Sequence, residues 1–334
     1  MAGTADLHPP DFESIIDAAR LLRGVAAVTP LLRSDALDAR LGASVWVKAE
    51  CLQRTGSFKF RGAWTNISRL PDARRERGVV AYSSGNHAQA VAAVASLRNI
   101  PATIAMPQDA PAIKRARTER WGADVAPFDR ETADRVGFAE ALADDLDRPI
   151  VPPYDHPDTI AGQGTVGLEI ASQCRALGIV PDAVVVPCGG GGLIAGIATA
   201  LGTAMPGVPV HPCEPATGDD TIRSLQAGRR IALPGPVRSV CDALLADTPG
   251  ALTFEINRRI LASGAAISDA EALYAMRIAF EDLKLVLEPG GAAGLAALAA
   301  DKVPCRGRTV IAVASGGNVD AGMFARALNS PGTR

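Results

Sequence analysis

The chain has 334 residues, which suits two domains of ordinary size and is too long for one small core. It is 48% hydrophobic and 21% charged with a formal net charge of −2, so the composition gives no sign of a nucleic-acid-binding or membrane protein. The six cysteines lie far apart without any Cys-x-x-Cys pair, which argues against a zinc knuckle or a disulfide framework.

The amino terminus, MAGTADLHPPDF, lacks the basic segment and apolar run of a signal peptide. No later stretch of about 20 residues is apolar and uncharged enough to cross a membrane. Together with the scattered cysteines, which we expect to be reduced and buried, these features predict a cytoplasmic protein.

The predicted elements begin with an amphipathic helix over 11–23 and a strand over 45–50. From residue 79 strands and helices alternate. The order is strand VVAYS, helix 86–98, strand PATIAMP, helix 111–121 and strand ADVAPF. This βαβαβ order requires a parallel sheet.

The same alternation resumes after a Pro-rich segment, IVPPYDHPD. The elements there are helix 164–177, strand DAVVVPC, a helix from Leu193, strand VPVHPCE and, after further helices including the Ala-rich segment 292–300, strand TVIAVASGG. We therefore predict an α/β protein of two domains, each an open, mostly parallel twisted sheet flanked by helices. The small domain spans 78–152, and the large domain combines 1–77 with 153–330.

Four consecutive glycines follow an apolar strand and open a helix in the run CGGGGLIAG. Glycines allow backbone N–H groups to approach an anion at the positive end of a helix, so phosphate is the expected occupant. Tight packing of helix on strand would explain one or two glycines but not four. A dinucleotide site remains an alternative, because Glu214 follows about 20 residues later, as in nicotinamide sites.

Lys59 lies between Phe58 and Phe60 in the run TGSFKFRG, where burying an amine is costly. A second polar turn, SSGNHAQA, also lies between a strand and a helix. A nicotinamide site explains neither feature. Pyridoxal phosphate would use Lys59, this polar turn and the four glycines, because it needs a lysine amine, polar groups for its ring and backbone donors for its phosphate.

Eight runs occur in chain order between Thr29 and Asp320: GSFKFRGA, SSGNHAQA, PQDAPAIKRARTERWGA, IAGQGTVGLEI, CGGGGLIAG, CEPATGDD, EPGGAAGLAAL and ASGGNVD. Together they resemble the pyridoxal-phosphate enzymes of the tryptophan-synthase-β type, specifically the serine/threonine dehydratase and serine racemase branch. The resemblance covers nearly the whole chain and implies the two-domain fold called type II. Relatives of this kind also suggest a homodimer.

The resemblance assigns cofactor roles residue by residue. Lys59 would be the lysine that bonds covalently to the cofactor, with Phe58 packed against the ring and Glu288 beneath it. Glu288 could instead stabilise a helix N-terminus. The remaining contacts would be Asn86 to the ring hydroxyl oxygen, Ser315 to the pyridine nitrogen, and Gly189, Gly190, Gly191 and Gly192 to the phosphate.

Substrate contacts are implied in the same way. The turn with Ser83, Ser84, Asn86 and His87 is similar to the family's loop for the substrate carboxylate, and its backbone donors at a helix start suit an anion. His87 need contribute only its backbone. Arg135 stands where relatives place a substrate-contacting arginine, although an arginine at such a place is commonly an exposed helix residue.

The run EPATGDD resembles the family's site for a divalent cation. Its ligands would be Glu214, the backbone carbonyl of Gly218, and Asp220. A set of oxygen ligands favours Mg²⁺, Ca²⁺ or Mn²⁺ over zinc. A solvated acidic turn is the alternative.

The implied activity is that of an ammonia-lyase on a small 3-hydroxy amino acid of the serine or threonine type. The amine of Lys59 would take the Cα proton, and loss of the β-hydroxyl would lead to a 2-oxo acid and ammonia. Because Ser315 offers a neutral hydroxyl to the ring nitrogen, prompt elimination is favoured over transamination. Ser84 stands where the racemase branch places an acid opposite Lys59, so racemisation of serine or another amino acid is an alternative.

The run CDALLADT departs from the racemase pattern, since Ala243 replaces a glycine and Ala246 replaces a serine. This leaves open the choice of substrate, including a specialised one such as hydroxyaspartate. Two other classes also remain, namely a nicotinamide-dependent oxidoreductase using the glycines with Glu214, and a ligand-binding protein without turnover. Only fourteen residues follow ASGGNVD, too few for the regulatory domain of biosynthetic threonine dehydratases, so feedback by isoleucine through such a domain is not expected.

Overall fold

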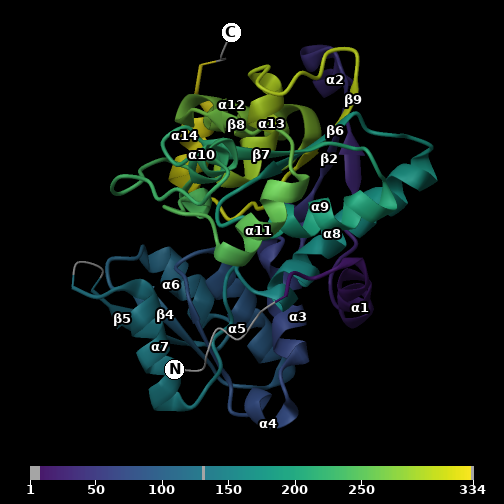
Figure 1. Ribbon diagram of the computed structural model, residues 1–334. Coiled ribbons are helices and arrows are strands. Elements are labelled where there is room, and N and C mark those ends of the chain that lie inside the picture. The colour runs from purple at the N-terminus through teal and green to yellow at the C-terminus, as the bar shows by residue number, and fades with distance from the viewer. Residues whose placement is uncertain (1–7, 130–131, 332–334) are drawn as a thin grey trace.

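The computed structural model describes residues 8–129 and 132–331. These residues form two separate sheets, which Figure 1 shows in the upper and lower parts of the molecule. The larger sheet has six strands in the order β1-β2-β9-β6-β7-β8, and the smaller has three in the order β3-β4-β5. The alternation of strands and helices expected from the sequence is therefore confirmed.

The six-stranded sheet is parallel except for the β1–β2 pair, which is antiparallel. Its inner strands are apolar on both faces, as in strand β6, where Val184 and Val186 contact one core cluster and Val185 contacts another. A parallel sheet covered by helices on both sides produces this pattern. The strands are β1 (Leu31–Arg33), β2 (Ser44–Lys48), β6 (Ala183–Pro187), β7 (Val210–Pro215), β8 (Ala265–Ile267) and β9 (Thr309–Val313).

Helices cover both faces of this sheet. One face packs against α8 (Pro157–Leu177) and α9 (Gly192–Ala204), with α1 (Phe12–Leu22) lying outside them. The other face packs against α2 (Asp35–Leu41), α12 (Asp269–Leu283), α13 (Ala293–Ala299) and α14 (Ala321–Leu328). The further helical elements of this part are α10 (Asp220–Ala227), α11 (Ala251–Ile260), η1 (Glu50–Leu52), η2 (Arg54–Gly56), η3 (Asp242–Leu244) and η4 (Gly290–Ala292).

The three-stranded sheet is entirely parallel and consists of β3 (Val79–Tyr82), β4 (Ala102–Pro107) and β5 (Asp124–Phe128). Helices α3 (Lys59–Arg69) and α5 (Asn86–Arg98) pack on one face, and α7 (Arg135–Leu146) packs on the other. The shorter helices α4 (Asp72–Arg75) and α6 (Ala112–Glu119) complete this part of the chain.

Helix α8 differs from the expected helix over 164–177, because it begins seven residues earlier, at Pro157. Proline fits the first position of a helix, where its missing N–H has no partner to lose. His156 caps this end by accepting a hydrogen bond from the backbone N–H of Asp158. The Pro-rich segment is therefore partly a helix start and not only a linker.

The division into domains 78–152 and 1–77 with 153–330 stays a prediction, and residues 1–7 of it lie outside the described part of the chain. Phe60, Ala63, Trp64 and Ile67 of α3 belong to the same core cluster as the three-stranded sheet. Helix α3 also packs against α8, so it contacts both parts of the chain. None of the helices described in the structure combines the length and apolar composition that a membrane crossing requires.

Candidate active site

A cavity of about 610 Å³ lies between the two sheets, beyond the ends of strands β3 and β6. Open parallel sheets bind ligands at this carboxyl edge, where loops from several strands converge. The cavity is lined by every residue that the sequence assigned to cofactor or substrate: Phe58, Lys59, Ser83, Ser84, Asn86, His87, Arg135, Gly189, Gly190, Gly191, Gly192, Glu288 and Ser315. Their individual roles remain predictions.

Lys59 is the first residue of α3, and the chain just before it is tied to the segment after β9. The backbone N–H of Phe58 donates to the carbonyl of Ser315 at 3.1 Å, and Ser57 forms a bridge with Gly316. The amine of Lys59 donates to the carbonyl of Pro153 at 2.7 Å. The side chain therefore ends inside the cavity and not at the protein surface.

Burial of the Lys59 amine lowers its pKa to about 8. Its Nζ lies 5.2 Å from the centre of the Phe58 ring. Phe60, in contrast, is fully buried and stacks on Trp64 with ring centres 6.0 Å apart. A lysine with a lowered pKa provides the uncharged amine that acts as a nucleophile or as a base near neutral pH.

A buried ion-pair network fixes α3 two residues after Lys59. Arg61 donates to both carboxylate oxygens of Glu50 at 2.8 Å and to Glu169 of α8 at 2.7 Å. Lys48 reaches the same Glu169 at 2.6 Å. A guanidinium bound through both branches has one orientation, and losing either acid would leave a buried charge unpaired. The network therefore restrains the helix that carries the lysine.

The glycine turn, residues 189–192, connects β6 to α9. No described residue accepts a hydrogen bond from the backbone N–H groups of these four glycines. A Cβ on Gly190 would lie 2.4 Å from the ring of Tyr154, and one on Gly192 would lie 2.9 Å from the Cβ of the same tyrosine. Free N–H groups at a helix start, in a turn closed to side chains, fit the phosphate of the expected cofactor.

The serine turn, residues 83–87, connects β3 to α5 in the same manner. The backbone N–H of Ser83 donates to Ala105 at 3.1 Å, and the Ser83 hydroxyl accepts from the N–H of Gly85 at 3.1 Å. Within the described residues, the backbone N–H groups of Asn86 and His87 have no acceptor. These two donors at a helix start suit the carboxylate of a substrate.

His87 is buried beside this turn, and its Nε2 lies 2.8 Å from the carbonyl of Val151, to which the neutral ring donates. Burial lowers the pKa of His87 to about 3, and the nearby amine of Lys59 contributes to this lowering. The imidazole therefore stays neutral at physiological pH. This supports a role for the His87 backbone and gives none to its ring as an acid.

A hydrogen-bond chain orients the side chain of Asn86, which directly precedes His87 in the serine turn. Its Oδ1 accepts from Asn318 at 2.7 Å, so its Nδ2 faces Glu288, to which it donates at 2.6 Å. Asn318 is itself fixed by a bond to the carbonyl of Thr55. Burial raises the pKa of Glu288 to about 7. The second proton of the Asn86 amide is available for the cofactor oxygen that the sequence assigned to it.

Two tyrosines and Arg135 form another part of the wall. The Arg135 guanidinium lies 5.6 Å from the centre of the Tyr82 ring, and within the described residues it has no carboxylate partner. Burial raises the pKa of Tyr82 to about 12 and also raises that of Tyr154, so both hydroxyls remain protonated. Among the described residues Arg135 forms no ion pair, so together with the two hydroxyl donors it can bind an anionic ligand.

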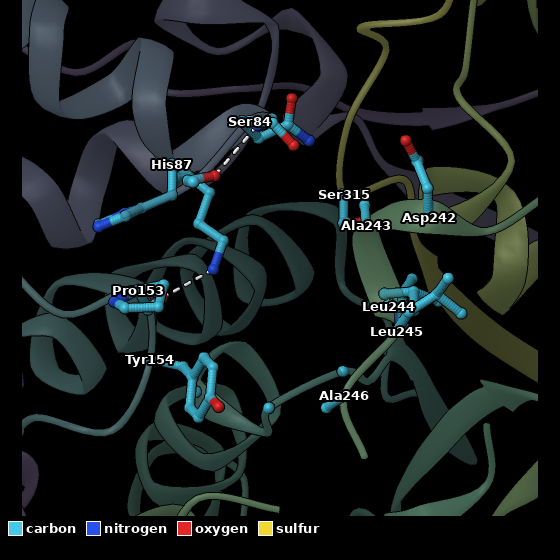
Figure 2. Close-up of a pocket in the computed structure, with 18 of the residues that line it drawn as sticks. Ser84, His87, Pro153, Tyr154, Asp242, Ala243, Leu244, Leu245, Ala246 and Ser315 are labelled. Carbon is cyan, nitrogen blue, oxygen red and sulfur yellow. Dashed lines mark hydrogen bonds between the residues drawn. The ribbon is translucent and has the colours of Figure 1, made fainter. Parts of the chain in front are cut away.

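Figure 2 shows Ala243, Leu244, Leu245 and Ala246 on the side of the cavity opposite His87 and Pro153, with the Tyr154 ring below. The substituted alanines therefore do face the cavity, where they offer no hydroxyl. Near them Asp242 forms an ion pair with Lys114 of α6. This wall is mostly apolar, and its one lysine is already paired.

The predicted cation ligands lie outside the cavity, at the end of β7 and the start of α10. Glu214 is fully buried and accepts from the N–H groups of Thr221 and Ile222 at 3.1 and 2.8 Å. Both carboxylate oxygens of Asp220 are buried without a partner among the described residues. Burial raises the pKa of Asp220 to about 7 and that of Glu214 well above its usual range. Helix capping explains Glu214, whereas Asp220 fits a cation ligand.

In the described part of the chain, no three His, Cys, Asp or Glu side chains are grouped to hold a metal ion. The predicted set would therefore depend on the two carboxylates with the backbone of Gly218, which is buried in the same turn.

The cavity is also lined by residues to which the sequence gave no role, among them Tyr82, Pro153, Tyr154 and Asn318. Pro153 and Tyr154 belong to the Pro-rich segment, which looked like a linker. Asn318 ends the run ASGGN, in which only Ser315 received a role. No local pattern marks these residues, because each contacts a part of the chain distant in sequence.

A family model described as pyridoxal-phosphate dependent enzyme matches residues 22–316. An L-threo-3-hydroxyaspartate ammonia-lyase from a Pseudomonas species is 43% identical over 317 residues, which cover 95% of this chain and 98% of that protein.

Two solved structures are similar over nearly the whole chain. The threonine deaminase of T.th. is 39% identical with a TM-score of 0.88, covering 93% of this chain and 99% of that one. Maize serine racemase is 35% identical with a TM-score of 0.90, covering 96% of this chain and 97% of that one. The predicted fold class is confirmed by this likeness.

Proposed function

Because the chain belongs to the family of pyridoxal-phosphate dependent enzymes, we propose that it is an ammonia-lyase acting on a small 3-hydroxy amino acid. The net reaction removes water across Cα and Cβ, and hydrolysis of the resulting enamine gives a 2-oxo acid and ammonia. One observation carries the proposal: the Lys59 amine, with its lowered pKa, lies in a cavity lined by two helix starts whose N–H groups have no acceptor among the described residues.

Different cavity residues would bind the cofactor, bind the substrate and accept the proton. When bound, pyridoxal phosphate withdraws electrons from the substrate and makes its Cα proton removable. Lys59 would hold it covalently, the glycine turn would bind its phosphate, and Asn86 and Ser315 would contact its ring. The N–H groups of Asn86 and His87 would bind the α-carboxylate of the substrate. Once the amine of the substrate has replaced Lys59 on the cofactor, the released, uncharged amine of Lys59 would accept the Cα proton.

For the substrate itself we propose 3-hydroxyaspartate. The Pseudomonas relative is an L-threo-3-hydroxyaspartate ammonia-lyase, and this substrate carries a second carboxylate that needs a cation. Arg135 is a cavity cation without a carboxylate partner among the described residues, whereas Lys114 is paired with Asp242. Serine and threonine have no group to use Arg135 in this way. The product from hydroxyaspartate would be oxaloacetate.

Racemisation is the second candidate, because Ser84 lines the same cavity and maize serine racemase shares the fold. The apolar side chains of Ala243 and Ala246 argue against racemisation, since the racemase pattern has a glycine and a serine at these two positions. Ser84→Ala should abolish any racemisation and retain elimination. Equal loss of both activities would exclude separate roles for Lys59 and Ser84.

The test of function is a panel of L- and D-3-hydroxy amino acids, including both diastereomers of 3-hydroxyaspartate, with ammonia, oxo acid and enantiomer measured together. We expect release of ammonia, fastest from an L-3-hydroxyaspartate. No ammonia from any member of the panel would refute the lyase proposal. Interconversion of enantiomers without ammonia would favour the racemase.

Three further features are part of the proposal. Glu214, Gly218 and Asp220 would bind Mg²⁺, Ca²⁺ or Mn²⁺, supported by the unpartnered buried oxygens of Asp220. A cytoplasmic location is supported by six cysteines that are all free and buried. A homodimer is expected from the family resemblance.

A further inference from the structure

The carbonyl groups of the glycine turn are bound from behind by α11. The hydroxyl of Thr253 donates to the carbonyl of Gly190 at 2.7 Å. One turn later, the amide of Asn257 donates to the carbonyl of Gly191 at 3.5 Å. Both side chains are fully buried, so they reach the turn without competition from solvent.

The start of α11 is itself fixed by one carboxylate. Asp155 accepts hydrogen bonds from the backbone N–H groups of Ala251, Leu252 and Thr253 at 2.8, 2.9 and 3.0 Å. A carboxylate at this place satisfies donors that otherwise lack partners and suits the positive end of the helix. Asp155 directly follows Pro153 and Tyr154, which contact the amine of Lys59 and the glycine turn. The position of α11 is thus tied to the cavity wall.

The contact between α11 and the glycine turn leaves no free space. A Cβ on Gly191 would lie 2.8 Å from the amide nitrogen of Asn257 and 3.0 Å from the hydroxyl of Thr253. A Cβ on Gly250 would lie 2.3 Å from a carboxylate oxygen of Asp155. The turn and the helix therefore cannot approach or shift without losing these bonds.

A trans peptide unit is planar, and its carbonyl points away from the N–H group of the following residue. Because the Gly190 carbonyl points toward Thr253, the N–H of Gly191 points away from α11. In the same way the bond from Asn257 to the Gly191 carbonyl makes the N–H of Gly192 point away from α11. Those N–H groups have no partner among the described residues. We propose that Thr253, with Asn257 and the helix cap Asp155, is a positioning residue that aims the N–H groups of the glycine turn at the cofactor phosphate.

The test uses the difference between pyridoxal phosphate and pyridoxal, which lacks the phosphate but has the same aldehyde. Thr253→Val keeps the shape of the side chain and removes the hydroxyl. We expect the affinity of the cofactor-free protein for pyridoxal phosphate to fall about tenfold, because the turn, once released from Thr253, must be reoriented at a cost on the order of one hydrogen bond before it can bind the phosphate. The affinity for pyridoxal should stay the same, and Thr253→Ser should restore binding of the phosphorylated form.

Thr199→Val is the matched control, because its hydroxyl also donates to a backbone carbonyl, that of Ala195 at 2.8 Å within α9. It should leave both affinities unchanged. Equal weakening of both ligands by Thr253→Val, or no weakening of either, would overturn the proposal. If Thr253→Val does not fold, Asp155→Asn tests the same arrangement at the cap of α11. This variant should bind pyridoxal phosphate more weakly and pyridoxal as well as the wild-type protein does. These measurements need no substrate, so they stand apart from the lyase proposal.

Discussion

In the serine turn and in the glycine turn a parallel strand is followed by a helix start whose N–H groups have no acceptor in the described part of the chain. The two turns differ in how tightly their neighbours pack around them. At Gly85 of the serine turn, an added Cβ would have nothing within 4 Å. In the glycine turn, an added Cβ on Gly190, Gly191 or Gly192 would lie within 3 Å of a neighbouring side chain. One turn has room to adjust, and the other is surrounded.

This difference agrees with the ligands proposed for the two turns. A substrate carboxylate enters and leaves in every reaction cycle, whereas a cofactor phosphate stays bound. The glycine turn is backed by the ring of Tyr154 and by Thr253, whereas no atom beyond its chain neighbours lies within 4 Å of the position of a Cβ on Gly85 in the serine turn. Preformed donors bind an anion without the cost of ordering a loop at each binding event.

The largest expected effect is on the affinity for pyridoxal phosphate when a methyl group is added to the glycine turn, compared with the same change in the serine turn. Gly190→Ala would displace the Tyr154 ring, and an overpacking cost of roughly 1–3 kcal/mol predicts about a 5- to 150-fold loss of affinity for pyridoxal phosphate. Gly85→Ala should change that affinity by less than about threefold, because its methyl group has space. Spectroscopic titration of cofactor-free protein measures both. Similar losses in the two variants would remove the distinction between the turns.

Arg135→Gln tests the side of the cavity that carries the substrate. Losing a charged hydrogen bond to the second carboxylate of hydroxyaspartate should lower kcat/KM for that substrate by about 10- to 100-fold. The value for serine should change little, because serine has no second carboxylate. Arg117→Gln is the matched control, since this cavity arginine already donates to the carbonyls of Asn318 and Val319. Equal losses for both substrates would exclude Arg135 as the specificity residue.

Loading of the cofactor should depend on pH through Lys59. Since burial lowers the pKa of Lys59 to about 8, the uncharged fraction of the amine falls about tenfold for each pH unit below that value. The rate of loading should therefore rise with pH and level off above about 8. His87 does not titrate in this range, and Glu288→Gln controls for the carboxyl whose pKa is about 7. A rate still rising steeply toward pH 10 would show an unshifted lysine.

The smallest expected effect concerns the cation. If Asp220 binds Mg²⁺, adding the ion should raise the Tm of the wild-type protein by a few °C after treatment with a chelator, following the usual linkage between binding and stability. Asp220→Asn should abolish this shift. Asp219→Asn, a neighbour that pairs with Arg223 at the surface, should retain it. No shift in the wild-type protein with Mg²⁺, Ca²⁺ or Mn²⁺ would remove the site.

Local patterns predicted the parts of the site that lie on single turns. The helix expected over 86–98 matches α5, because a glycine-containing polar turn and an apolar strand mark its start. The glycine turn was predicted in the same way, and Lys59 because an amine is costly to bury between two phenylalanines; both line the cavity. The start of α8 was missed because a Pro-rich run indicates a linker as readily as a helix start.

The parts that could not be predicted depend on contacts between distant segments. Thr253 reaches Gly190 across 63 positions of sequence, and Asn318 reaches Asn86 across 232. Arg61 lies in the run GSFKFRGA, but its ion pairs with Glu50 and Glu169 form only because α3 packs against α8. Motifs identify the groups that touch a ligand, whereas the groups that position them become visible only in the fold.

The most direct test is chemical labelling of the lysine. Holoenzyme reduced with borohydride, digested and analysed by mass spectrometry should carry the reduced cofactor on Lys59 and on no other lysine. The Lys59→Ala variant should remain unlabelled and colourless while keeping its fold by circular dichroism. Label on a different lysine, or a wild-type protein that takes up no pyridoxal phosphate, would contradict the account.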